Sequence, residues 1–459
     1  MAHVHLIGIG GAGLSAIATV LLQQGYRVSG SDREASTATA RLAQQGATVF
    51  IGHKAENLAG PIDAVVISSA IPADNPELVG ARRRGLPVVK RAEWLGQMMQ
   101  AKVGLAVAGT HGKTTTTAML AFILRQAGQD PSFIVGGFIP QLETNAAAGQ
   151  GNAFVIEADE YDYMFLGLRP EVAVVTIVEW DHPDMFPSPQ ALTQAFEDFV
   201  RLVPAHGLVI GCGDDPGAVR VIAQAAAKTI TYGLRPENEW QAVDIQPNGR
   251  GGHDFKMVGQ DAILPHVAMS LAVPGLHNVY NALAALIAAE RAGVELAQAA
   301  EIIGQFKGVG RRFELKGEIN GVTVIDDYAH HPTEIRATLA AARSRFAGRP
   351  IWAVFQPHTF SRTLALLDDF AQAFTDADHV VLVDIFASRE TDQGLVKSSD
   401  ILARMSHPDA RYLGSVSAAA DYLATHLAPP AVLVTMGAGD SYLIGEEVLK
   451  KLGHSLYRN

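Results

Sequence analysis

The sequence predicts an α/β protein of three domains, and three observations support this fold class. The 459 residues correspond to about three domains of typical size. Short apolar runs alternate with helical stretches along most of the chain, a pattern typical of parallel sheets built from βαβ units. Glycine-rich turns follow apolar runs at three places, in "GIGGAG", "GTHGKT" and "MGAGD". We therefore expect a Rossmann-like domain over residues 1–100, a P-loop mononucleotide-binding α/β domain with a β insertion over 101–310, and a Rossmann-like domain over 311–459.

The first domain begins with a strand, a glycine-rich turn and a helix. Apolar runs predict strands over residues 3–9, 26–32, 47–53, 63–71 and 87–94, with helices over 14–24 and 37–45. Gly8, Gly10 and Gly13 have the spacing with which a backbone turn approaches a pyrophosphate. Asp32 ends the second strand, where an acidic residue would meet a ribose. Taken alone, this pattern is also compatible with an NAD-dependent oxidoreductase.

The central domain repeats the alternation and then departs from it. We expect strands over residues 104–108, 153–160, 171–182, 206–215 and 228–234. Residues 240–258 break the rhythm and favour antiparallel β-structure around a glycine-rich turn, and residues 277–293 return to helix.

The third domain is predicted to open with a hairpin. The Asn-Gly pair in "EINGVTV", residues 318–324, is a strong turn signal. Strands follow over residues 350–358, 379–388 and 431–440. The last of them ends in the turn "MGAGD", for which the sequence indicates no ligand.

Composition excludes several classes of protein. The net charge of −11, without a block of like charges, argues against non-specific nucleic-acid binding. Cys212 is the only cysteine, so a disulfide within the chain is impossible. The N-terminus lacks the features of a signal peptide, and no apolar run is long enough for a membrane helix. We expect a soluble, cytoplasmic protein; a monomer and a homodimer are both compatible with the sequence.

The stretch "GTHGKTTTT" predicts a phosphate-binding loop between a strand and a helix. Gly109 and Gly112 allow backbone N–H groups to close around phosphate oxygens at a helix N-terminus. Lys113 supplies a cation for the β- and γ-phosphates, and Thr114 offers a hydroxyl to Mg²⁺. Glu157, in "EADEYD", and His182, in "EWDHPD", follow neighbouring strands and are candidate metal-side residues.

Seven motifs, in order along nearly the whole chain, resemble those of the Mur ligases of peptidoglycan synthesis. They are "IGIGGAGLS", "GTHGKTTTT", "EADE", "HNVYNALAA", "GVGRRFE", "DDYAHHPTEI" and "QPHTFSRT". The resemblance implies domains that bind a UDP-substrate, ATP and an amino acid. It implies that ATP, with Mg²⁺, phosphorylates the lactyl carboxylate of UDP-N-acetylmuramate, and that L-alanine then attacks the acyl phosphate. A ligase that attaches a preformed murein tripeptide remains an alternative, while the later motifs argue against the oxidoreductase.

The resemblance also implies roles for individual residues. The UDP-substrate would meet Gly8, Gly10, Gly11, Gly13, Asp32, His53, Ser68 and Ser69. ATP would meet Gly109, Thr110, His111, Gly112, Lys113, Thr114, Thr115, Asn278 and Asn281, and the metal ion would meet Thr114, Glu157 and His182. The catalytic residues would be Lys113, His182, Arg311, His330, His358 and Arg362, with His358 and Arg362 stabilising the acyl phosphate and binding the amino-acid carboxylate.

Several of these roles have plainer alternatives. Ser68 and Ser69 could cap a turn, and Asn278 could cap a helix. Of Arg311 and Arg312, which are adjacent and point in different directions, at most one is expected to be catalytic. Asp326, Asp327, His330 and His331 could form a metal cluster, an interpretation that we disfavour. Thr359 stands where some family members have arginine, which leaves open how the amino-acid carboxylate is held.

Overall fold

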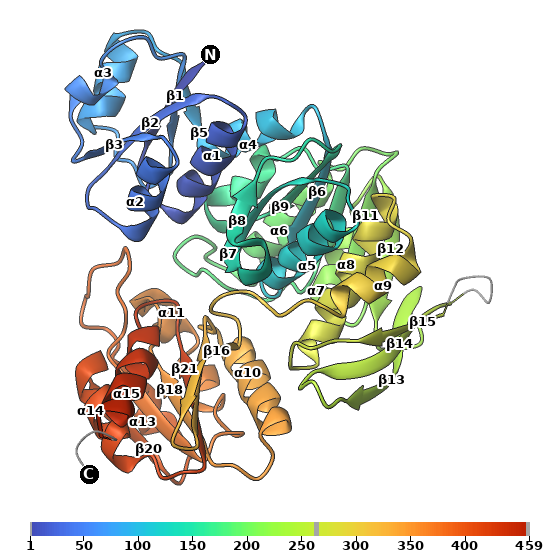
Figure 1. Cartoon of the computed structure of the whole chain (residues 1–459), viewed down its shortest axis with the longest axis vertical. Coiled ribbons are helices and arrows are strands. Elements are labelled where there is room, and N and C mark those ends of the chain that lie inside the picture. The colour runs from blue at the N-terminus through green and yellow to red at the C-terminus, as the bar shows by residue number, and fades with distance from the viewer. Residues whose placement is uncertain (1, 261–265, 456–459) are drawn as a thin grey trace.

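The computed structural model describes residues 2–260 and 266–455, which fold into three α/β domains, each with its own sheet (Figure 1). The predicted fold class is confirmed. The N-terminal and C-terminal domains both flank the central domain, and the antiparallel end of the central sheet lies away from the N-terminal domain. No described helix combines the length and apolarity needed to cross a membrane.

The N-terminal sheet is parallel, with strand order β3-β2-β1-β4-β5. Its elements are β1 (His3–Ile7), α1 (Ala12–Gln23), β2 (Arg27–Asp32), α2 (Thr37–Gln44), β3 (Thr48–Ile51), η1 (Ala55–Leu58), β4 (Ala64–Ile67), α3 (Pro76–Arg83), β5 (Val88–Lys90) and α4 (Arg91–Met99). The predicted strand over 87–94 is therefore too long, since helix α4 begins at Arg91. The turn Gly8–Gly13 follows β1 directly, so it lies at the carboxyl end of that strand, and helix α1 begins within it at Ala12.

The central sheet has the order β15-β14-β13-β12-β11-β10-β6-β9-β7-β8. Its first elements are β6 (Val103–Ala108), α5 (Lys113–Gln126), β7 (Ser132–Ile139), η2 (Pro140–Leu142), β8 (Thr144–Ala147), β9 (Ala153–Glu157), η3 (Tyr161–Gly167) and β10 (Val172–Val175). The others are α6 (Pro189–Val200), β11 (Leu208–Cys212), α7 (Pro216–Ile222), β12 (Lys228–Gly233), β13 (Trp240–Pro247), β14 (His253–Gly259), β15 (Val267–Ser270), α8 (His277–Arg291) and α9 (Leu296–Ile303). Strands β9 and β10 both pair with β6, so the loops that follow all three meet at one edge of the sheet.

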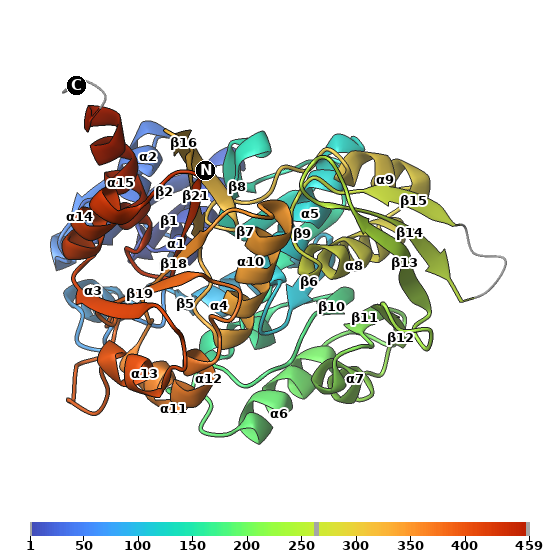
Figure 2. The ribbon, with the colours of Figure 1, turned by 90° about the horizontal axis from the view of Figure 1, so that it is seen from below.

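The central domain contains the predicted antiparallel insertion, but one of its strands is shorter than predicted. The antiparallel insertion is confirmed, since β13 pairs with β14 and β14 with β15, and it extends from one side of the domain (Figure 2). The strand predicted over 171–182 is wrong in length, because β10 ends at Val175. Glu179 and His182 therefore lie on an irregular loop whose backbone is anchored by side chains, as where Glu179 N donates to Thr110 Oγ1 at 3.0 Å.

The C-terminal sheet has the order β16-β17-β21-β18-β19-β20, parallel except for β16. Its elements are β16 (Glu314–Ile319), β17 (Val322–Asp327), α10 (Pro332–Arg345), β18 (Ile351–Phe355), α11 (Phe360–Ala365), α12 (Leu367–Ala371), β19 (His379–Val383), α13 (Ser398–Arg404), β20 (Ala410–Gly414), α14 (Val416–His426), β21 (Ala431–Met436) and α15 (Tyr442–Ser455). The predicted hairpin is confirmed, with Asn320 and Gly321 both at positive φ in its turn. Helices α10 and α12 pack on one face of the sheet, and α14 and α15 pack on the other.

Candidate active site

The phosphate loop is the turn between β6 and α5. Gly109 and Gly112 have φ values of 134° and 82°, a region that side chains with a Cβ rarely adopt. A Cβ on Gly112 would also lie 2.6 Å from Asn281 Oδ1. The loop therefore requires glycine at both positions, and it leaves the N-terminus of α5 facing a cavity.

Lys113 is held in place by the loop and by a buried carboxylate. Its Nζ donates to the carbonyl oxygen of Gly109 at 2.6 Å and lies 2.8 Å from Glu160 Oε2. Burial alone would lower the pKa of Lys113, but Glu160 raises it above the ordinary value. Burial raises the pKa of Glu160 to about 7, although Lys113 acts in the opposite direction. The lysine is thus a fixed cation beside the loop.

Thr114 and Glu157 form a pair of hard oxygen donors. Thr114 Oγ1 donates to Glu157 Oε1 at 2.8 Å, and Glu157 Oε2 accepts from Gly136 N at 2.6 Å. Hydroxyl and carboxylate oxygens are ligands that Mg²⁺ prefers, so this pair fits such an ion. For His182, the third predicted metal-side residue, Nε2 lies 3.7 Å from Glu160 Oε1, and its metal binding stays a prediction.

The two predicted asparagines share a face of helix α8 and reach the loop. Asn281 Nδ2 donates to Asn278 Oδ1 at 3.0 Å, and Asn281 Oδ1 accepts from Thr116 Oγ1 at 3.1 Å. Asn278 Nδ2 donates back to the carbonyl oxygen of Pro274 at 2.7 Å. Both side chains are buried, and both line the same cavity as Gly112.

A cluster of histidines and one buried arginine joins the central and C-terminal domains. Arg362 donates from Nε and Nη2 to the two carboxylate oxygens of Asp181, at 2.6 and 3.2 Å. Its other contacts are His358 Nδ1 at 3.1 Å and His182 Nδ1 at 3.3 Å. The structure therefore brings His182, His358 and Arg362 together. The guanidinium is only 2% exposed and occupied by Asp181, so its binding of an amino-acid carboxylate stays a prediction.

The imidazoles of this cluster are held neutral. Burial lowers the pKa of His330 to about 3, and Arg362 adds to this effect. Burial likewise lowers the pKa of His358 to about 3, reinforced by His330 and Arg362. The two rings lie edge to face, with centroids 5.7 Å apart. Neutral rings can accept or donate one hydrogen bond to a substrate without adding charge.

The adjacent arginines diverge, and the predicted choice between them needs correction. Arg311 has a φ of 58° and points into the C-terminal domain, where Nε donates to Asp326 Oδ2 at 2.9 Å. Its Nη2 donates to the carbonyl oxygen of Gly437 at 2.8 Å. Arg312 instead faces the phosphate loop, with Nη2 3.5 Å from Thr114 Oγ1. The geometry therefore favours Arg312, not Arg311, as the cation near the phosphates.

A cavity of about 850 Å³ lies between the central and C-terminal domains. The phosphate loop and the start of α5 line it with His111, Gly112, Thr114 and Thr115. Strand β17 and helix α10 line it with Asp327, Thr333 and Glu334. Aromatic and apolar groups of the central domain, among them Tyr232, Val273 and Tyr280, line it too. Its size and mixed lining suit a nucleotide. The disfavoured cluster of Asp326, Asp327, His330 and His331 does not form, because Asp326 pairs with Arg311.

The N-terminal turn is a separate site. Gly10 N donates to Asp32 Oδ2 at 2.8 Å, so this carboxylate stabilises the conformation of the turn. Gly13 packs so closely against Arg91 that a Cβ would lie 2.3 Å from Nη1. Ser68 Oγ accepts from Ala70 N at 3.3 Å, which fits the turn-capping alternative. Ser69 lines a second cavity, of about 330 Å³, together with Arg91.

His53 is tied to a buried polar network of the N-terminal domain. Its Nδ1 lies 2.9 Å from Ser31 Oγ and 3.5 Å from Glu77 Oε2. Glu77 is fully buried, and it also bonds Ser31 and Asn57. These contacts join β2 to η1 and α3, so His53 has partners within the domain, and its contact with the UDP-substrate stays a prediction.

The sequence assigned no role to three charged residues of the site: Glu160, Asp181 and Glu334. Glu160 and Asp181 lie in the same acidic runs as Glu157 and His182, and the sequence does not indicate which acid of a run faces the site. Glu334 had a local signal, because it is the third helical residue after His331 and completes a capping box at the start of α10. Burial alone would raise the pKa of Glu334, but His330, His111 and Arg312 hold it well below its ordinary value.

Comparison with known families matches all three domains. Residues 3–103 match the Mur ligase family, catalytic domain; residues 107–289 match the Mur ligase middle domain; residues 311–439 match the Mur ligase, glutamate ligase domain. A UDP-N-acetylmuramate--L-alanine ligase of Frankia casuarinae is 44% identical over 99% of this chain and 98% of its own. The chain belongs to the Mur ligase family.

Other relatives refine the position of this Mur ligase. A UDP-N-acetylmuramate--L-alanine ligase of Alkaliphilus metalliredigens is 42% identical, with 97% of each chain covered. The crystal structure of the UDP-N-acetylmuramate-alanine ligase MurC of Thermotoga maritima gives a TM-score of 0.82 at 29% identity, covering 99% of this chain and 100% of that one. A murein peptide ligase of Psychrobacter arcticus gives 0.74 at the same 29% identity, with 99% of both chains covered.

Proposed function

We propose that this Mur ligase joins L-alanine to UDP-N-acetylmuramate at the expense of ATP, through an acyl-phosphate intermediate. One observation carries the proposal: a phosphate loop with its own lysine faces a nucleotide-sized cavity that the C-terminal domain completes. The full-length similarity to L-alanine ligases supports the choice of substrates.

Each domain has a part in this reaction. Residues 1–100 bind the UDP-substrate at the turn Gly8–Gly13, where a diphosphate can approach backbone N–H groups at the start of α1. Residues 101–310 bind ATP at the phosphate loop. Residues 311–459 bind the amino acid, whose amine must reach the activated carboxyl group between the central and C-terminal domains.

In the first step the lactyl carboxylate attacks the γ-phosphorus of ATP. A P–O bond forms to the carboxylate, the bond to the β-phosphate oxygen breaks, and ADP leaves. Negative charge on the phosphoryl oxygens has to be met by fixed cations. Lys113 is positioned for this by Glu160, and Arg312 by Glu334, from which its Nη1 lies 3.7 Å.

Mg²⁺ would be held by Thr114 and Glu157, and when bound it would neutralise charge on the phosphates. The donor pair is already aligned by a hydrogen bond, and Gly136 N orients the carboxylate. The threonine hydroxyl can keep this bond when the ion binds, because its oxygen has lone pairs to offer.

In the second step the amine of L-alanine attacks the acyl carbon. A C–N bond forms, phosphate leaves with its electron pair, and the proton that the amine loses passes to the departing phosphate. His330 and His358 are neutral and lie at the carboxyl ends of β17 and β18, where they can hydrogen-bond the incoming amine. Arg362 offers the guanidinium best matched to a carboxylate or phosphate, provided that Asp181 shares it.

A murein-tripeptide ligase is the second candidate. The Psychrobacter arcticus enzyme has the same 29% identity to this chain as the Thermotoga maritima enzyme, so the solved structures by themselves do not decide between the acceptors.

The test is phosphate release from ATP in the presence of UDP-N-acetylmuramate and one acceptor at a time. L-alanine, L-serine, glycine and the tripeptide L-Ala-γ-D-Glu-diaminopimelate are compared at equal concentration. We expect L-alanine first, with only modest discrimination against glycine, because one methyl group in a pocket contributes about 1–3 kcal/mol. Preference for the tripeptide would assign the chain to the second candidate, and tighter binding of NADH than of the UDP-sugar would contradict both.

A further inference from the structure

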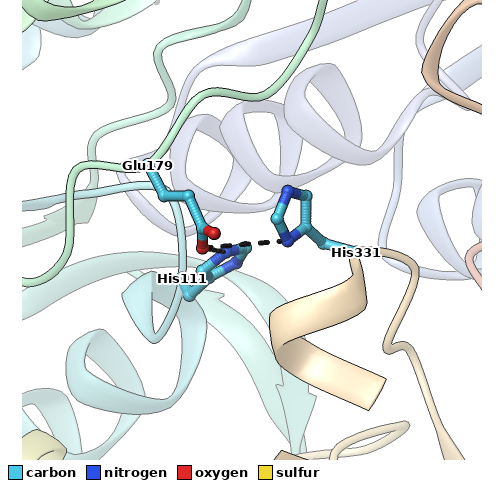
Figure 3. Close-up of side chains that lie close together, drawn as sticks. All are labelled: His111, Glu179 and His331. Atoms are coloured by element: carbon cyan, nitrogen blue, oxygen red, sulfur yellow. Dashed lines mark hydrogen bonds and ion pairs between the residues drawn. The ribbon is translucent and has the colours of Figure 1, made fainter. Parts of the chain in front are cut away.

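We propose that His111, Glu179 and His331 form a second cation site, for a transition metal of the zinc class, at the boundary between the central and C-terminal domains. The three side chains come from the phosphate loop, from the loop after β10 and from the start of α10, and they converge on one carboxylate oxygen (Figure 3). His111 Nε2 lies 3.0 Å from Glu179 Oε2, and His331 Nδ1 lies 3.8 Å from the same oxygen.

The separations fit a metal ion. Ligand atoms at tetrahedral zinc, bound at about 2.0–2.2 Å, are roughly 3.4 Å apart. The distances of 3.0 and 3.8 Å bracket this value, and one ligand atom from each of the three residues lies within 4.8 Å of the others. Small rotations of the side chains would therefore bring the three ligand atoms to one ion, leaving a fourth position for water.

The donor chemistry selects the class of metal. Two imidazoles and one carboxylate are a ligand set that zinc uses with three protein ligands. Mg²⁺ prefers oxygen ligands and keeps much of its water, so it is disfavoured here. Thr114 and Glu157 offer only oxygens, so we expect Mg²⁺ at that pair and zinc at the site with two imidazoles.

Two outer contacts orient the ligands as in metal sites. His111 Nδ1 lies 3.2 Å from Glu334 Oε1, and Nε2 is hydrogen-bonded to Glu179 Oε2 at 3.0 Å. If Nδ1 donates its N–H to Glu334, Nε2 can exchange its bond to Glu179 for a bond to the ion. Glu179 uses its other oxygen, Oε1, to accept from Thr333 Oγ1 at 3.0 Å. Both contacts turn the ligating atoms toward the same point.

The imidazole of His331 is buried and makes few hydrogen bonds. Its side chain is only 3% exposed, and its Nε2 is a buried atom without a hydrogen-bond partner in the part of the chain that the structure describes. Nδ1 accepts only a long bond of 3.3 Å from Thr333 N. The long bond leaves Nδ1 weakly engaged, so this nitrogen can turn to a cation beside Glu179 Oε2, while Nε2 keeps its N–H.

Occupation of this site would tie α10 of the C-terminal domain to the phosphate loop. The metal would hold His111, whose neighbour Gly112 must shape the loop around phosphate, and would restrain the separation of the domains. We therefore expect zinc to slow turnover of ATP even with Mg²⁺ in excess.

The experiment uses the full-length chain stripped of metal, without nucleotide and with excess Mg²⁺. Zn²⁺ is titrated against a chromogenic chelator, and Co²⁺ is used in parallel because its visible bands report coordination by nitrogen and oxygen. We expect one Zn²⁺ per chain, and we expect Glu179→Gln and His331→Gln each to weaken it at least about tenfold. His206→Ala removes an exposed histidine and is the matched control, which should bind like the parent.

Other outcomes would overturn the site. The absence of a stoichiometric Zn²⁺ ion, its displacement by Mg²⁺, or unchanged affinity in Glu179→Gln would each mean that the cluster is a hydrogen-bonded contact only. Glu179→Gln keeps the size of a side chain that is 39% exposed on a loop, and its melting temperature is compared with the parent's to show that the variant folds. Binding of zinc is measured without substrates, so it does not depend on the acceptor proposed above.

Discussion

The phosphate loop and the turn Gly437–Asp440 share one local design, a strand followed by glycines and a helix, yet the structure uses them in opposite ways. At the phosphate loop, Lys113 and the start of α5 leave a cavity ready for an anion. At the second turn, the carbonyl oxygens of Gly437 and Gly439 accept from Arg311, at 2.8 and 3.1 Å. This turn binds a cation of the protein itself. A glycine-rich turn thus allows another group to approach the backbone closely. Whether that group is an anion or a cation depends on which backbone and side-chain groups face it.

The largest effect is expected at the phosphate loop. Lys113→Ala removes the cation that faces the γ-phosphate, and it should lower the rate of phosphate release by about 10²–10³-fold. Glu160 then loses its partner but can take up a proton, since burial already raises its pKa to about 7. The measurement is phosphate release at saturating ATP, with circular dichroism as the control for folding. A folded variant with nearly the parent's rate would contradict the assignment of the loop.

The two adjacent arginines test the contrast between the turns. Arg312→Ala should reduce phosphate release by about 10²-fold while leaving the melting temperature close to that of the parent. Arg311→Ala breaks a pair with the fully buried Asp326 and leaves two carbonyl oxygens without their donor, so it should cost about 3 kcal/mol of stability.

Each arginine variant is the control for the other. Scanning calorimetry of the full chain measures the stability, and initial rates measure the activity of the fraction that stays folded. If Arg311→Ala abolished activity in a chain of unchanged melting temperature, the roles would have to be exchanged.

A smaller effect should separate two roles of Arg362. If it binds the amino-acid carboxylate, Arg362→Ala should raise the KM for alanine about tenfold. This factor corresponds to the loss of one charge-assisted hydrogen bond of roughly 1.5 kcal/mol. Asp181→Asn keeps the arginine but releases it from its partner, and it should leave this KM unchanged or lower it. Equal increases of the KM for ATP and for alanine in both variants would indicate that the pair only holds the domains together.

The smallest effect concerns Cys212, which lines the nucleotide cavity but is only 4% exposed. Burial raises the pKa of its thiol to about 12. At pH 8 only about one thiol in 10⁴ is then ionised, and the thiolate is the reactive form. The native chain should therefore react with a thiol reagent far more slowly than the chain in urea. The reaction is measured from the coloured product that the thiol reagent releases. Rapid labelling of the native protein would show that the cavity opens widely at this end.

Local patterns determined much of this protein. Alternating strands and helices, the Asn-Gly hairpin and the glycine spacing at Gly109 and Gly112 depend on residues close in sequence, so the sequence alone predicts them. The pairing of Thr114 with Glu157 was also predictable, because the loops after parallel neighbouring strands meet at one edge of a sheet.

The tertiary structure decided which charges meet. Arg311 and Arg312 are adjacent in sequence, yet the positive φ of Arg311 sends one guanidinium into the C-terminal domain and the other to the phosphate loop. Arg362 reaches Asp181, and Glu334 reaches His111, across 181 and 223 residues of chain. No local preference encodes such contacts, since they exist only when the faces of two separately folded domains come together, and burial at that boundary then sets which groups carry charge.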